Sequence, residues 1–64
     1  MSTPLSIAID IERLVAEAKA RQRAIDVTTC AGELYLRFLA AGCSREQIAE
    51  ALEDEAEAAG VTIH

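Results

Sequence analysis

The residues best suited to chemistry in this sequence are two cysteines and one histidine. Cys30 and Cys43 lie thirteen positions apart, and His64 is the last residue. A structural zinc site needs about four ligands at short spacings, which this set does not supply. If the segment between the cysteines is mostly helical, their Cα atoms lie roughly 15–20 Å apart, whereas a disulfide needs about 4.4–6.8 Å. We therefore expect no metal site and two free thiols, which are typical of the reducing cytoplasm.

The sequence also lacks the groupings that catalysis uses. It has no histidine near a serine or cysteine, no glycine-rich phosphate loop and no carboxylate pair in an evident pocket. Both cysteines fall at positions where helices pack, so buried structural roles explain them. We expect neither an enzyme nor a cofactor, and no small-molecule substrate is evident.

Composition narrows the remaining classes. The chain has 64 residues, is 52% hydrophobic and 27% charged, and carries a net charge of −5. A run of about 18 apolar residues, as a membrane span requires, is missing, and the N-terminal residues do not resemble a signal peptide. Thirteen of the hydrophobic residues are alanines, which bury little area. A core this small is usually supplemented by disulfides, a metal or a partner, and a partner is the supplement that the sequence favours.

Three helices must form this core, and the first is predicted over residues 11–23. Ile11, Leu14 and Val15 begin an apolar stripe with helical spacing. Asp10 just before it is a good N-cap residue, and Ile9 could form a hydrophobic staple with Leu14. Residues 1–9 are then expected to be a leader outside the helix.

The second and third helices are predicted from similar signals over residues 27–41 and 45–59. Asp26 is the expected N-cap of the second helix, and Gly42 is expected to end it. Ser44 and Gln47 have the spacing of a capping box at the start of the third helix. Gly60 is expected to end that helix, and the tail of residues 60–64 could fold back onto the core.

The second helix carries more apolar residues than one buried face requires. Besides its main stripe it has Tyr35, Leu36 and Leu39 on its flanks or opposite side. Glu33 and Arg37 could form an ion pair across one helical turn. A helix that is apolar nearly all round is buried on more than one side. Tyr35, Leu36 and Leu39 are therefore expected to form the interface of a homodimer or of a complex with another protein, although a central helix in a monomer would also explain them.

Acidic residues are concentrated at the C-terminal end. Residues 46–64 contain six acids and no base, whereas residues 1–45 contain five acids and six bases. The acids predicted to share an exposed face of the third helix are Glu46, Glu50, Glu53, Asp54 and Glu57. This face either serves solvation alone or docks a basic partner.

A nucleic-acid role is the main alternative. Residues 40–52 resemble part of a helix-turn-helix. A recognition helix over 45–59, however, would turn acids toward the DNA phosphates, and Arg45 would be its single basic residue. Because DNA binding depends on cations, nucleic-acid binding is the less favoured interpretation. It could take the form of a degenerate helix-turn-helix or of an acidic antagonist of a DNA-binding protein.

The sequence thus predicts a single all-α domain of three helices with short connections. Because the connections are short, helices that follow each other in the chain are expected to pack as antiparallel neighbours. It predicts a small cytoplasmic adaptor or regulatory protein that acts through protein–protein contact, as a homodimer through the second helix.

Overall fold

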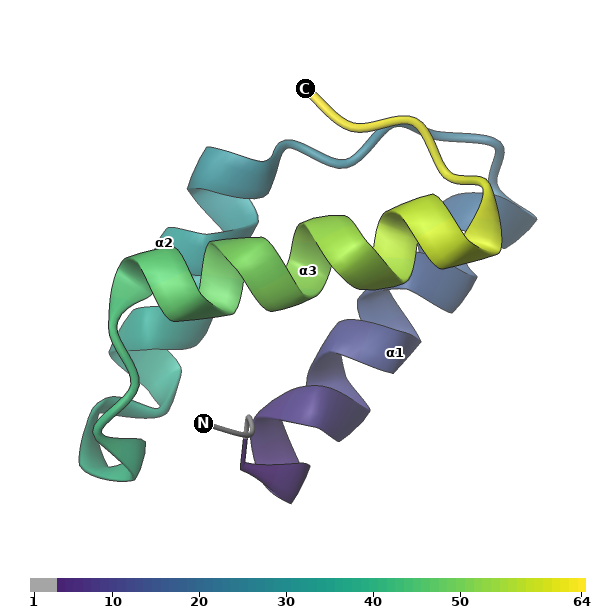
Figure 1. The fold of residues 1–64 in the computed structure, drawn as a ribbon. Helices are drawn as coiled ribbons and strands as arrows, with labels where there is room; N and C mark the ends of the chain where they lie inside the picture. Colours follow the sequence, from purple (N-terminus) through teal and green to yellow (C-terminus); the bar gives the residue numbers. More distant parts are fainter. Residues whose placement is uncertain (1–3) are drawn as a thin grey trace.

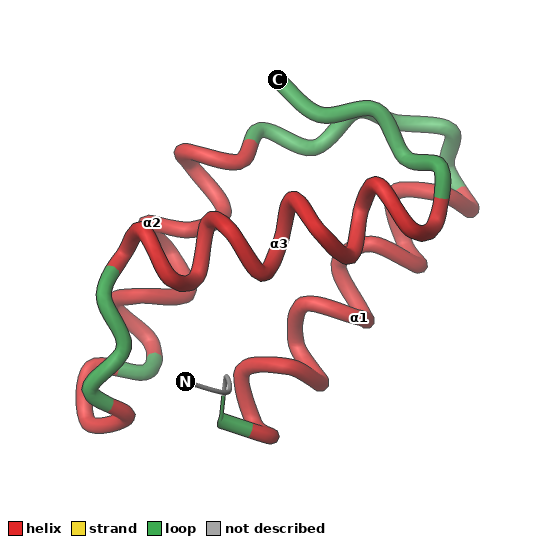
Figure 2. The backbone as a smooth tube through the Cα atoms, viewed as in Figure 1, coloured by secondary structure: helices red, strands yellow, loops and turns green. Residues whose placement is uncertain are grey.

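The computed structural model describes residues 4–64 as a bundle of three α-helices, which confirms the predicted fold class. The elements are α1 (Leu5–Ala20), α2 (Val27–Arg37), the short 3-10 helix η1 (Leu39–Ala41) and α3 (Arg45–Ala59). The helix α3 lies across the other two and packs against both (Figure 1). Loops form the connections between the helices, the C-terminal tail and Pro4 ahead of α1 (Figure 2).

The helix α3 begins and ends where the sequence predicts. The Ser44 hydroxyl accepts a hydrogen bond from the Gln47 backbone N–H at 3.1 Å, and the Gln47 side chain accepts one from the Ser44 N–H at 2.8 Å. This reciprocal pair is the predicted capping box. Gly60 has a φ of 76° at the other end, and Gly42 has a φ of 75° after η1. Both glycines therefore adopt the left-handed conformation that was expected of them.

The prediction for the first helix is wrong at both ends. The helix α1 begins at Leu5, with Pro4 as its N-cap residue, and ends at Ala20 instead of residue 23. Asp10 lies inside the helix and caps nothing. Residues 5–9 of the predicted leader are helical, and residues 1–3 lie outside the described residues. The physical reason is burial: Ile7 continues the stripe of Ile11 and Val15 one turn earlier and is completely buried, and this apolar contact outweighs a cap at Asp10.

The second helix starts as predicted but ends earlier. The Asp26 carboxylate accepts a hydrogen bond from the Thr29 backbone N–H at 3.1 Å, which confirms the N-cap. The regular helix stops at Arg37 instead of residue 41, because Phe38 leaves helical geometry with φ −116° and ψ 40°. The chain then continues as η1, whose tighter turn leads into Gly42.

The core lies between α3 and the other two helices. Its fully buried large side chains are Ile7 from α1, Leu34 from α2, and Ile48 and Leu52 from α3. Ala56 of α3 is also completely buried, so small side chains let the helices approach closely. Cys30, Phe38 and Cys43 pack against this core while remaining half-buried.

The C-terminal tail closes the bundle against the linker between α1 and α2. Ile25 forms an isolated parallel bridge with Ile63: the Ile25 N–H donates to the Thr62 carbonyl, and the His64 N–H donates to the Ile25 carbonyl, both at 2.9 Å. Val61 also packs against the core. The predicted return of the tail is therefore present.

Candidate functional site

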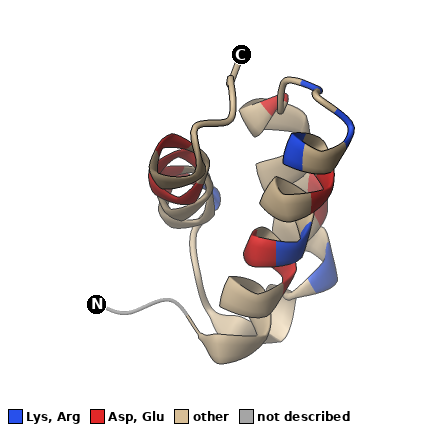
Figure 3. Ribbon diagram, turned by 90° about the vertical axis from the view of Figure 1, so that its right-hand side faces the viewer, with Lys and Arg blue, Asp and Glu red and all other residues tan. Residues whose placement is uncertain are grey.

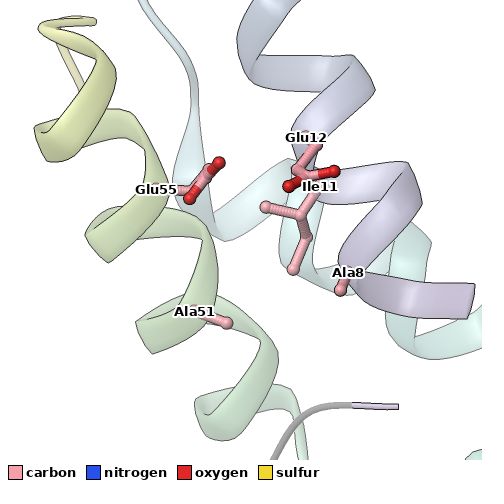
Figure 4. A pocket seen from close by; sticks show the side chains of 5 residues that line it. All are labelled: Ala8, Ile11, Glu12, Ala51 and Glu55. Carbon is pink, nitrogen blue, oxygen red and sulfur yellow. The ribbon is translucent and has the colours of Figure 1, made fainter. Parts of the chain in front are cut away.

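A small hollow lies between α1 and α3 (Figure 4). Its volume is about 150 Å³, and Glu12 of α1 and Glu55 of α3 line it together with Ala8, Ile11 and Ala51. This is below the roughly 300–1,000 Å³ of ordinary ligand sites. Two carboxylates alone also make a poor metal site, and in residues 4–64 no three histidine, cysteine or acidic residues come together as ligands. The hollow does not suggest a function.

A larger hollow of about 450 Å³ lies where α1 and α3 both end. Lys19, Gln22 and Arg23 line one side, and Gly60 and Val61 line the other. Two helix C-termini meet there, and their carbonyl ends attract cations. The basic residues are thus explained by the helix ends, without an anionic ligand. Gln22 adopts a left-handed conformation with a φ of 54°, as the turn out of α1 requires.

The cysteines are free and half-buried, as predicted. Burial raises the pKa of the Cys30 thiol, and the carboxylates of Glu33 and Asp26 raise it further. A raised pKa lowers the fraction of thiolate, which is the nucleophilic form. Cys30 is thus a packing residue rather than an activated nucleophile.

The most distinctive surface is apolar. Leu36 of α2 is 65% exposed and Leu39 of η1 is 59% exposed. Leu36 lies two residues from the buried Leu34, and 3.6 residues per turn place it on the opposite side of α2. These are two of the three residues that were predicted to form an interface, and both are open to solvent.

The third predicted interface residue, Tyr35, has a different setting. It is half-buried and packs against the core. The guanidinium of Arg45, at the start of α3, lies 5.3 Å from the centre of its ring, within range of a cation–π contact. Tyr35 therefore joins α2 to α3 and lies apart from the exposed leucines.

Leu5 and Ile9 of α1 add to the apolar surface, although the sequence placed them in a leader. They are 75% and 46% exposed. Because Ile7 and Ile11 are buried toward α3, Ile9 between them lies on the opposite side of the helix. The signal that could have found them is the spacing of Ile7, Ile11 and Val15, which extends the helix toward the N-terminus.

An ion pair connects the two parts of this surface. Nη1 of Arg37 donates to Oδ2 of Asp10 at 2.8 Å. The predicted pair within α2, between Glu33 and Arg37, is replaced by this contact between helices. The pair joins the N-terminal half of α1 to the C-terminal end of α2, and both of these segments lie at the bottom of Figure 1. We call Leu5, Ile9, Leu36 and Leu39 the apolar surface.

The acidic face of α3 lies away from the helices that it packs against (Figure 3). All of its predicted members are exposed: Glu46, Glu50, Glu53, Asp54 and Glu57. Carboxylates in water need no partner, so exposure by itself is compatible with simple solvation.

In the described part of the chain, no helix combines the length and apolarity needed to cross a bilayer. Comparison with protein families, curated proteins and solved structures finds no significant match to this chain.

Proposed function

We propose that this protein acts by protein–protein association, first as a homodimer, and that it performs no catalysis. The observation that carries the proposal is the exposure of Leu36 and Leu39 at 65% and 59%, together with that of Leu5 and Ile9 on α1. Single exposed aliphatic residues are ordinary on protein surfaces, but a group of large ones at one end of a small domain is typical of an interface.

The size of the domain supports the same proposal. A chain of about 60 residues buries a modest fraction of its surface, and its core supplies only about 3–5 kcal/mol. Covering the apolar surface would add stabilisation of about 25 cal/mol per Å² of apolar area removed from water. Within residues 4–64 both thiols are free, and no three histidine, cysteine or acidic residues are grouped as metal ligands. A second subunit is therefore the remaining way to stabilise this small core.

The proposal includes a role as an adaptor or regulatory protein in the cytoplasm, a compartment that suits free thiols. A nucleic-acid role has less support. Arg45 is the one basic residue of α3, and its guanidinium is engaged over the Tyr35 ring.

Sedimentation equilibrium at micromolar concentration tests the proposal. We expect a mass near twice the 6.9 kDa of one chain. A single species at 6.9 kDa across the concentration range, combined with a cooperative thermal transition, would contradict the homodimer.

A double substitution, Leu36→Glu with Leu39→Glu, locates the interface. Both side chains are mostly exposed, so the helical fold should persist while the dimer is lost, because two carboxylates per subunit cannot be buried without partners. The matched control, Ala58→Glu with Thr62→Glu, adds the same charge at exposed positions away from the apolar surface and should remain dimeric. A dimer that survives the leucine substitutions would exclude these positions from the interface.

A further inference from the structure

We draw no further inference here: the strongest candidate, the exposed apolar face of α2 around Leu36, carries nothing beyond the proposed function, because nothing in the structure of residues 4–64 shows what covers it.

Discussion

Asp26 is the N-cap residue of α2, and its contribution to stability depends on pH. Its carboxylate caps α2 by accepting the Thr29 backbone N–H, and this hydrogen bond lowers the pKa of Asp26 below its ordinary value of 3.8. The folded chain therefore binds a proton on Asp26 less readily than the unfolded chain does. The resulting stabilisation is present above pH 3.8 and is lost as the pH falls through the lowered pKa.

We predict that Asp26→Asn flattens the acid side of the stability profile. Asparagine caps a helix about as well as aspartate but does not titrate. At neutral pH the two proteins should be similar in stability, and below pH 4 the unmodified protein should lose more of its free energy of unfolding. Urea denaturation followed by circular dichroism at several pH values measures this difference. Parallel profiles for the two proteins would mean that the cap is not coupled to protonation.

The caps also indicate which residues are predictable from sequence. The helix caps act within one helical turn of their own positions, so their roles follow from local chemistry. These residues are Asp26, Ser44 with Gln47, Gly42 and Gly60. Asp10 has the same chemistry but a different outcome, because the burial of Ile7 extends α1 past it. Its actual partner, Arg37, is 27 residues away, and local spacing carries no information about such a contact.

The helix α3 joins the fold together, since α1 and α2 each pack mainly against it. Its inward face is formed by Ile48, Leu52 and Ala56, all nearly or completely buried. This helix and its apolar stripe were predictable from the sequence because the N-cap, the stripe and the terminal glycine all indicate the same helix bounds. It missed the helical part of α1 that carries Leu5 and Ile9, since a plausible cap at Asp10 competed with the apolar spacing.

We predict that Leu52→Ala unfolds most of the protein. Removing a fully buried leucine costs about 2–5 kcal/mol, which is comparable to the total of about 3–5 kcal/mol for a core of this size. Leu36→Ala is the comparison within α2, and it should change the stability of the monomer by less than about 0.5 kcal/mol because Leu36 is exposed. Circular dichroism at a concentration below the dissociation constant distinguishes them. A stable Leu52→Ala variant would show that the packing against α3 matters less than its burial indicates.

The molecule as a whole is electrostatically two-sided. The acids of α3 face outward on one side, while α1 and α2 carry both signs of charge (Figure 3). The exposed apolar residues Leu36 and Ile9 lie on the sides of their helices away from the core, so association through them would leave the acidic face free.

We predict that duplex DNA does not bind appreciably at about 20 mM salt, where electrostatic attraction is strongest. The net charge is −5, and α3 offers phosphates a single base that already contacts Tyr35. Fluorescence anisotropy with a labelled duplex measures binding. Binding that weakens steeply with added salt would indicate phosphate contacts and would favour the nucleic-acid alternative over the proposed function.

The position of α3 in the chain has a consequence for biosynthesis. The two earlier helices bury their apolar stripes mainly against α3, which follows them in sequence. A chain emerging from the ribosome exposes Ile7, Ile11 and Leu34 until residues 45–59 have also emerged. The bundle therefore completes its core only after α3 has emerged, and until then the stripes of α1 and α2 are open to chaperones.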